Sequence, residues 1–331
     1  MRLPRRAGSR RRPASRWWHT VSDPSLPAAP GPSRAWRWCC RNASRVTDPL
    51  DLVRAFADDL DDADVAFGHG AADARTEAEH LVLGYRDAHG WSPGAPDALR
   101  ALLERRIEER VPVAHLTGRA WFAERWFVVW PGVMIPRSPL QELILAGFRP
   151  WLRRKPDRIL DLCCGCGALG IAAALEFPEA SLTLVDVDAA AVACARTNVA
   201  RFGLETRAEV RWSDLFDALD GPRYDLVISN PPYVSVGEIA RLPPEYGSEP
   251  VEGLAAGADG LDCWRAILGA LGAWLEPRGL LAGEAGNTAP ALAGAFPELP
   301  FAWPELADAP RLANGDFGVF VLDGDCLSTQ G

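Results

Sequence analysis

The pattern of apolar positions divides the chain into two parts. Between residues 49 and 110, apolar residues recur at helical spacing, which predicts three amphipathic helices at about 49–60, 73–88 and 96–110. From residue 158 onward, short apolar runs alternate with helical stretches. This alternation is typical of a doubly wound α/β fold with a parallel sheet. The pattern therefore predicts a small helical domain followed by a larger α/β domain.

Seven short apolar runs are predicted to form the strands of the main sheet. They lie at 158–162, 182–186, 208–212, 224–228, 279–284, 301–306 and 317–322. The last two runs predict a closing antiparallel hairpin, because no helical stretch separates them. Helices are predicted from residue 139 to about 153 and at about 260–275. The expected sheet therefore has seven strands.

Aromatic and β-branched runs link the two parts of the chain. Ala120-Trp121-Phe122 and Trp126-Phe127-Val128-Val129, split by three polar or small residues, predict a β-hairpin. We therefore expect a helical domain at 46–118, a hairpin linker at 119–138, an α/β domain at 139–324 and a tail at 325–331.

Residues 1–45 differ from the rest in composition. They contain 11 arginines, one aspartate and many Pro, Ser and Ala residues, without apolar periodicity, so a disordered leader is predicted. No continuous apolar segment follows the arginines, which excludes a secretory signal. Two interpretations stay open: an Arg-rich transit peptide, or an over-long start. The single lysine, Lys155, against 34 arginines is typical of GC-rich coding sequence and makes the second plausible.

Charge and composition restrict the class of partner. With 48% hydrophobic residues, 24% charged residues and no apolar run near 18 residues, a soluble globular protein without a membrane span is predicted. The leader carries a net charge of +10 and the whole chain −9, so residues 46–331 carry −19. Such a body favours a basic protein partner over nucleic acid. Eight cysteines without framework spacing indicate a reducing, cytosolic compartment.

One stretch carries unusual chemistry. Asn230-Pro231-Pro232-Tyr233 follows an apolar run that predicts a buried strand. Proline keeps the preceding backbone extended and supplies no N–H, which leaves an amide side chain and carbonyl oxygens at the strand end. These acceptors suit a planar –NH2 group, whose two hydrogens they can hold. The simpler interpretation, a strand-ending turn, is equally compatible with the tetrapeptide alone.

A glycine-rich loop after the first predicted strand indicates a nucleotide-like cofactor. Gly165-x-Gly167-x-x-Gly170 precedes a predicted helix, and Asp186 ends the next strand 21 residues after Gly165, where it can hold a ribose diol. Asp214 and Leu215 follow the third strand and are placed to contact a base. A nicotinamide cofactor would fit this pattern too, but a dehydrogenase has no need of the tetrapeptide.

In this order, these motifs resemble the class I methyltransferases that use S-adenosylmethionine, and specifically the HemK-like protein-(glutamine-N5) methyltransferases. Further stretches resemble the PrmB-type branch, which modifies the third protein of the large ribosomal subunit. These include Phe67-Gly68-His69-Gly70, Arg110-Val111-Pro112-Val113, Pro136-Arg137-Ser138-Pro139 and Glu245-Tyr246. The resemblance covers about residues 50–322. The release-factor branch has Pro-Arg-Pro-Glu-Thr-Glu where this chain has Pro-Arg-Ser-Pro, so the ribosomal substrate is favoured.

The resemblance implies a seven-stranded, Rossmann-like methyltransferase sheet, a helical domain that recognises substrate, and a site without metal. The implied catalytic residues are Asn230, Pro231, Pro232 and Tyr233, with Tyr233 either packing against the substrate glutamine or serving only the structure. The implied cofactor contacts are Asp161, Cys163, Cys164, Gly165, Cys166, Gly167, Asp186, Asp214, Leu215 and Asn230. Cysteines replace the usual small residues of the loop, and they lack the spacing of metal ligands.

Two other function classes remain after this comparison of motifs. A nucleic-acid amino-group methyltransferase shares the tetrapeptide but needs a basic groove, which the acidic body disfavours. A non-catalytic ribosome-binding protein with a decayed cofactor site is the other. We expect the enzyme to be cytoplasmic and to act on a basic ribosomal protein of the large subunit rather than directly on nucleic acid.

Overall fold

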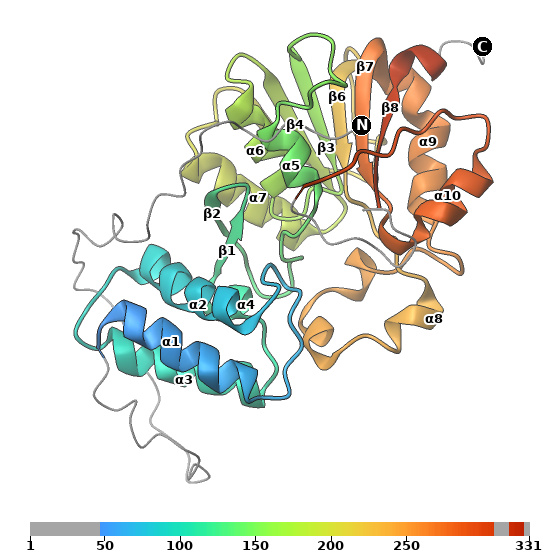
Figure 1. Cartoon of the computed structure of the whole chain (residues 1–331). Helices are drawn as coiled ribbons and strands as arrows, with labels where there is room; N and C mark the ends of the chain where they lie inside the picture. The colour runs from blue at the N-terminus through green and yellow to red at the C-terminus, as the bar shows by residue number, and fades with distance from the viewer. Residues whose placement is uncertain (1–46, 308–317, 328–331) are drawn as a thin grey trace. The chain divides into compact units, whose positions relative to one another are not determined.

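The computed structural model describes residues 47–307 and 318–327, which form two compact units (Figure 1). One unit comprises residues 47–121 together with Pro243–Ser248. The other comprises Phe122–Leu242, residues 249–307 and residues 318–327. The predicted leader at 1–45 and the last residues of the predicted tail lie outside the described residues.

The first unit is helical, and its helices follow the predicted pattern. They are α1 (Pro49–Asp61), α2 (Ala74–His89), α3 (Ala95–Glu108) and the short α4 (Val113–Thr117). Asp48 caps α1 by accepting from the Leu50 N–H, and Asp73 caps α2 by accepting from the Thr76 N–H. The three helices expected from apolar spacing are thus confirmed to within two residues at each end.

A segment distant in sequence completes the helical unit. Pro243–Ser248 forms a 3₁₀ helix, η3, whose Glu245 side chain is fully buried. Glu245 accepts from the Ala66 N–H and from the guanidinium groups of Arg106 and Arg110 at 2.9, 3.2 and 3.1 Å. No periodicity in the sequence indicates this attachment, because it rests on charged side chains rather than on an apolar face.

Residues 119–145 contain a hairpin and a short helix. Arg119–Phe122 (β1) and Arg125–Val128 (β2) pair as a two-stranded sheet, which confirms the predicted hairpin. The predicted helix from residue 139 to about 153 is too long, since α5 spans only Leu140–Leu145. Gly147 and Phe148 have φ of 62° and 55°, in the left-handed region, and Pro150 follows. These residues cannot continue a right-handed helix.

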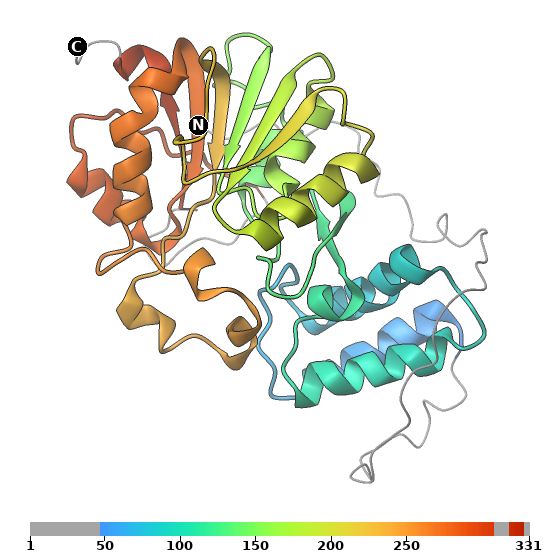
Figure 2. The same cartoon turned by 180° about the vertical axis from the view of Figure 1, so that it is seen from behind.

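The second unit is built on one six-stranded sheet of order β5-β4-β3-β6-β7-β8 (Figure 2). Its strands are β3 (Arg158–Leu162), β4 (Ser181–Asp186), β5 (Ala208–Trp212), β6 (Tyr224–Ser229), β7 (Leu275–Glu284) and β8 (Val319–Asp323). The first five pair in parallel, and β8 is antiparallel to β7. The predicted doubly wound α/β class is therefore confirmed.

The predicted strand at 301–306 is reduced to a β-bridge in the described residues. Ala302 exchanges two backbone hydrogen bonds with Val321 of β8, at 3.0 and 2.8 Å. Pro304 follows two residues later and has no N–H, so it cannot donate to a continued ladder. The sheet therefore has six strands rather than seven where the structure is described, with the parallel part as expected.

Helices lie on both faces of this sheet. They include α6 (Ala168–Glu176), α7 (Ala189–Arg201), α9 (Asp262–Trp274) and α10 (Ala289–Ala295). The short helix α8 (Val236–Ile239) and the 3₁₀ turns η4 (Val251–Gly253), η5 (Gly286–Thr288) and η6 (Gly324–Leu327) lie in the segments that follow the strands. Leu160 and Leu162 pack in one core with Trp264 and Ile267 of α9. Asp161, between the two leucines, points to the opposite face, where it meets Gly170 of α6.

The described residues contain no helix long and apolar enough to span a bilayer.

Candidate active site

The topology brings the predicted site residues to one edge of the sheet. The chain runs from β3 outward to β4 and β5, then returns to the other side of β3 as β6. This reversal is the switch point at which open α/β sheets bind ligands. Leu162, the last residue of β3, pairs with Ser229, the last residue of β6. The glycine-rich loop and the Asn230 tetrapeptide therefore leave neighbouring strands at the same edge.

The glycine-rich loop is tightly folded against the end of β4. The Gly165 N–H donates to Asp186 Oδ2 at 2.8 Å, and the Cys164 N–H donates to the Val185 carbonyl at 3.0 Å. A Cβ on Gly170 would lie 2.8 Å from the Asp161 Cβ, so only glycine allows α6 to approach β3 this closely. Cys163 has φ of 56°, a left-handed conformation that non-glycine residues rarely adopt.

Asp161 is a buried carboxylate with spare hydrogen-bonding capacity. Its Oδ2 accepts from the Gly170 N–H at 2.7 Å, whereas its buried Oδ1 has no hydrogen-bond partner among the described residues. Burial raises the pKa of this carboxyl from 3.8 to about 8. An orphaned acceptor beside the glycine-rich loop fits the ammonium group or another donor of S-adenosylmethionine. The residues present at this edge thus suit the cofactor that the sequence predicts.

The raised pKa of Asp161 predicts how the stability of the protein depends on pH. Between about pH 4 and about pH 8 the folded protein retains a proton on Asp161 that the unfolded chain releases. Stability should therefore fall as pH rises through this window. Asp161→Asn, which is neutral at every pH and keeps an acceptor for Gly170, should flatten that fall. Urea unfolding midpoints of both proteins across the window measure the effect, and parallel pH curves would contradict it.

Asp186 at the end of β4 shapes the loop and remains able to bind a diol. Its Oδ2 accepts from the Gly165 N–H and its Oδ1 from the Asp188 N–H at 2.9 Å. Burial raises its pKa, while these backbone bonds act in the opposite direction. Each carboxylate oxygen keeps a second acceptor position, which is what a pair of ribose hydroxyls requires. Asp186 is half-buried at the sheet edge, as expected of a cofactor contact.

Asp214 and Leu215 follow β5 at the same edge. Asp214 is exposed, and Leu215 has φ of 45°, the second left-handed non-glycine residue at a strand end. Ser213 holds this turn by donating from Oγ to the Leu215 carbonyl at 2.9 Å. The strained backbone orients the Leu215 peptide, which is consistent with the predicted contact to a base.

The cysteines of the glycine-rich loop are neutral thiols. Cys164 and Cys166 are 6% and 2% exposed, Cys163 is half-buried, and all three are free. Burial raises the pKa of each, which disfavours the thiolate that nucleophilic or metal-binding chemistry needs. In the described part of the chain, no group of three or more His, Cys, Asp or Glu side chains is arranged to hold a metal ion. The structure thus shows them as free thiols on small side chains within the loop.

The first two residues of the tetrapeptide present acceptors that have no partner among the described residues. The Asn230 side chain is half-buried and makes no hydrogen bond with the described residues. Pro231 is buried, and its carbonyl accepts no hydrogen bond from them. An Asx turn would need an N–H at position 232, where proline has none. Asn230 therefore does not stabilise the turn through its side chain.

The sequence did not identify the partner of Tyr233. The Tyr233 hydroxyl donates to Glu284 Oε1 at 2.9 Å, and the Ser138 hydroxyl donates to Glu284 Oε2. Burial raises the pKa of Glu284, against the opposite effect of these two bonds. Glu284 is the last residue of β7, the fifth parallel strand. A carboxylate at the carboxyl end of a predicted strand is the one sequence signal that could have indicated this residue.

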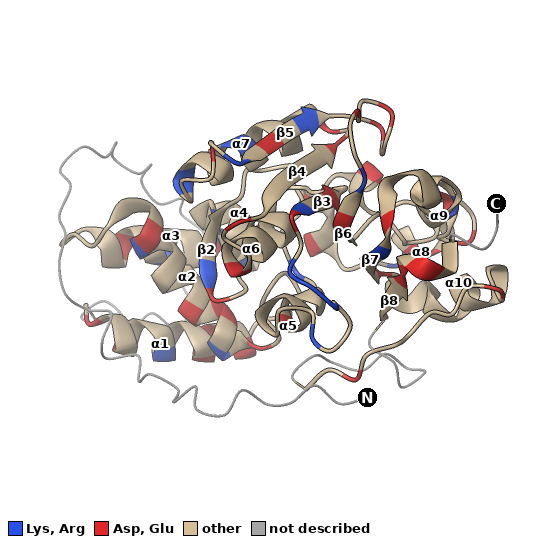
Figure 3. Cartoon of the chain, turned by 90° about the horizontal axis from the view of Figure 1, so that it is seen from above, with Lys and Arg blue, Asp and Glu red and all other residues tan. Residues whose placement is uncertain are grey.

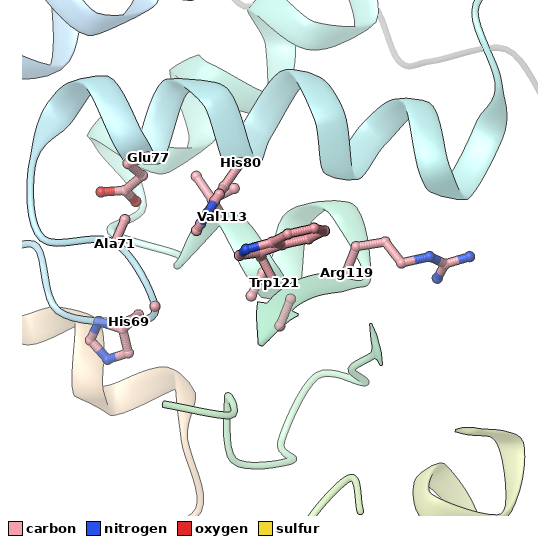
Figure 4. A pocket seen from close by; sticks show the side chains of 10 residues that line it. His69, Ala71, Glu77, His80, Val113, Arg119 and Trp121 are labelled. Atoms are coloured by element: carbon pink, nitrogen blue, oxygen red, sulfur yellow. The ribbon is translucent and has the colours of Figure 1, made fainter. Parts of the chain in front are cut away.

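A small pocket within the helical unit is distinct from these residues (Figure 4). It is lined by His69, Gly70, Ala71, Glu77, His80, Val113, Ala114, Arg119, Ala120 and Trp121. Burial lowers the pKa of His80 to about 4, so its imidazole is neutral near pH 7. None of the predicted catalytic or cofactor residues lines this pocket.

Comparison with known proteins identifies the family. The model of the methyltransferase small domain matches residues 145–241. The chain is 40% identical over 281 residues to a ribosomal protein uL3 glutamine methyltransferase of Bordetella pertussis, covering 81% of this chain and 94% of the relative. Relatives with the same name in Neisseria gonorrhoeae and Burkholderia pseudomallei are 39% and 40% identical, covering 86% and 82% of this chain and 97% and 93% of theirs. At this identity over nearly the full length of its relatives, the chain belongs to the family of ribosomal protein uL3 glutamine methyltransferases.

Proposed function

We propose that this protein methylates the side-chain amide nitrogen of a glutamine in ribosomal protein uL3, using S-adenosylmethionine. The observation that carries the proposal is the set of acceptors at the end of β6, where the Asn230 side chain and the Pro231 carbonyl accept no hydrogen bond from residues 47–307 or 318–327. The names of the relatives supply the substrate. The release factor, the main alternative from the sequence, has no comparable support among the relatives described above.

The two acceptors at the end of β6 can activate an amide nitrogen, which is a poor nucleophile. An amide nitrogen reacts slowly because its lone pair is delocalised into the carbonyl. If Asn230 Oδ1 and the Pro231 carbonyl each accept one N–H, the nitrogen can pyramidalise with its lone pair directed away from both. S-adenosylmethionine supplies an electrophilic methyl group when bound. No base is needed before attack, since the nitrogen becomes cationic and releases its proton afterwards.

The residues at the neighbouring strand ends would hold the cofactor. Asp186 would accept from the ribose hydroxyls, Asp161 from the ammonium group, and the backbone of Cys163–Gly167 would pass close to it. Asp214 and Leu215 would contact the base. The assignments of Asp161 and Asp186 rest on their spare acceptor positions, and those of Asp214 and Leu215 on their place after β5 at the same edge.

We expect Asp186→Ala to weaken cofactor binding by about 10- to 100-fold, corresponding to about 1.5–3 kcal/mol for lost charge-assisted hydrogen bonds. Because Asp186 also holds the Gly165 N–H, part of this loss reflects the loop. Asp186→Asn retains one acceptor oxygen and should lose less affinity than alanine does. Isothermal calorimetry measures the affinity of the wild type and of both variants for the cofactor. An unchanged affinity in Asp186→Ala would show that this residue does not belong to the site.

The protein partner is expected to be basic. Figure 3 marks Asp and Glu positions on both the helices and the strands, and residues 46–331 carry a net charge of −19. Asp58, Asp59, Asp61, Asp62 and Asp64 lie within one short stretch at the end of α1. We infer that the helical unit helps to recognise uL3, that nucleic acid is not the direct substrate, and that the enzyme acts in the cytoplasm.

Mass spectrometry of ribosomal proteins tests the proposal. A strain that lacks this protein should contain uL3 without one methyl group, and the wild-type protein should restore it. The Asn230→Ala variant should not restore it at matched expression. An unchanged uL3 mass would overturn the proposal, and loss of a methyl group from a peptide release factor would replace it with the alternative substrate.

A further inference from the structure

Glu284 accepts hydrogen bonds from two hydroxyl groups at the edge of the sheet where the catalytic residues are proposed. The Tyr233 hydroxyl donates to Oε1 at 2.9 Å, and the Ser138 hydroxyl donates to Oε2. Glu284 and Ser138 are buried, at 6% and 7% exposed. The carboxylate therefore uses one oxygen for the catalytic tetrapeptide and the other for a segment 146 residues earlier in the chain.

The strand register places Glu284 beside the acceptor asparagine. Ser229 of β6 pairs with Gly283 of β7 in parallel. Asn230 and Glu284 are the next residues along the two strands, so they leave the sheet side by side. The Glu284 side chain turns to Ser138 and Tyr233, whereas Asn230 makes no side-chain hydrogen bond with the described residues.

Tyr233 is confined by backbone on two sides as well as by Glu284. A Cβ on Gly286 would lie 2.4 Å from the Tyr233 ring, at Cε2. A Cβ on Gly260 would lie 2.4 Å from the Tyr233 carbonyl oxygen. Both glycines have positive φ, of 48° and 77°. The ring, the hydroxyl and the carbonyl of Tyr233 thus each have a close neighbour, which is typical of a residue that fixes a loop.

The Ser138 segment is anchored independently. Arg137 donates to both oxygens of Glu249, at 2.5 and 2.7 Å, and the Ile135 N–H donates to Glu249 Oε1 at 3.0 Å. The Glu249 side chain is fully buried. A bidentate pair of this kind holds the segment in one geometry, so Ser138 presents its hydroxyl to Glu284 from a fixed backbone.

We propose that Glu284 is a positioning residue for methyl transfer, which orients the Asn230 and Pro231 acceptors through its bond to Tyr233 and takes its own orientation from Ser138. This inference rests on the proposed function. It assigns Tyr233 to the support of the acceptors rather than to a contact of its hydroxyl with the substrate. Catalysis by positioning is sensitive to such support, because a misplacement of about 1 Å can cost about 100-fold in rate.

A double-mutant cycle of Tyr233→Phe and Glu284→Leu tests the proposal in the full chain, because leucine offers no acceptor to the Tyr233 hydroxyl. Each single variant should lower kcat for uL3 methylation by about 10- to 100-fold, with KM for cofactor and for uL3 within about twofold of wild type. The double variant should be no slower than the slower single variant, since both changes remove the same bond. Melting temperatures and cofactor affinity identify variants that have lost their fold.

Tyr224→Phe provides a matched control. Its hydroxyl bonds to Thr183 Oγ1 at 3.2 Å from the first residue of β6, at the opposite end of the strand, so kcat should stay near wild type. If Glu284→Leu does not fold, the cycle is repeated with Ser138→Ala and Tyr233→Phe, where Ser138→Ala removes the hydrogen bond that orients Glu284.

Additive losses, or a loss confined to KM for uL3 in Tyr233→Phe, would overturn the positioning role. Absence of uL3 methylation by the wild-type protein would instead reject the proposed function, so the two failures are distinguishable.

Discussion

Alanine at position 230 is expected to lower the rate of methyl transfer by about 100-fold or more, as does the loss of one oriented hydrogen bond in an acyl-transfer site. In the proposed mechanism, Asn230 Oδ1 is one of two acceptors for the substrate amide, and its side chain has no partner among the described residues. Without it, one N–H of the glutamine is unpaired and the nitrogen lone pair is no longer directed. Single-turnover methylation with saturating cofactor and uL3 measures the rate.

The fold and the cofactor site should survive this substitution. Pro231 still keeps the backbone of residue 230 extended, and no hydrogen bond within the described residues is lost. Cofactor affinity and melting temperature should therefore stay near those of the wild type. Asn287→Ala removes an exposed asparagine from η5, which follows β7, and serves as the control. A folded Asn230→Ala protein that turns over within a few-fold of wild type would refute the mechanism.

Replacing Arg106 by methionine is expected to destabilise the helical unit by about 3–5 kcal/mol, the usual result of removing one partner from a buried ionic network. Arg106 is 1% exposed and donates to Glu77 at 2.5 Å, to Glu245 at 3.2 Å and to the Ala66 carbonyl at 2.7 Å. Without the guanidinium, the Glu77 carboxylate loses its buried cation. Glu245 keeps the Ala66 N–H and, as its cationic partner among the described residues, the partly exposed Arg110.

Hydrogen exchange of the full-length protein, read peptide by peptide, measures this effect. Protection should fall across α1 to α3 and in Pro243–Ser248, because Glu245 attaches that segment to the helices. Arg105→Met is the matched control on the same helix. Its partner is Glu109, and both side chains are about half exposed, so the change should cost less than about 1 kcal/mol. Equal effects of the two substitutions would show that the buried network does not stabilise the unit.

Local patterns were sufficient to predict most of the fold. β3 and β5 have the predicted ends, and the three helices of the first unit agree within two residues, because apolar spacing follows directly from which face of an element is buried. The errors lie where backbone geometry overrides spacing. α5 ends at Leu145 before left-handed Gly147 and Phe148, and Pro304 interrupts the strand expected at 301–306.

The sequence by itself determined where the candidate site residues stand, because a parallel sheet places the carboxyl ends of its strands at one edge. Asp161, Asp186, Leu215 and Asn230 could therefore be assigned to that edge from their positions in or after predicted strands. Only the tertiary structure decided which side chains support them. Glu284 meets Ser138 across 146 residues, and Arg106 meets Glu245 across 139. Such pairs form through single polar contacts, which leave no periodic signal along the chain and arise only once the elements have packed.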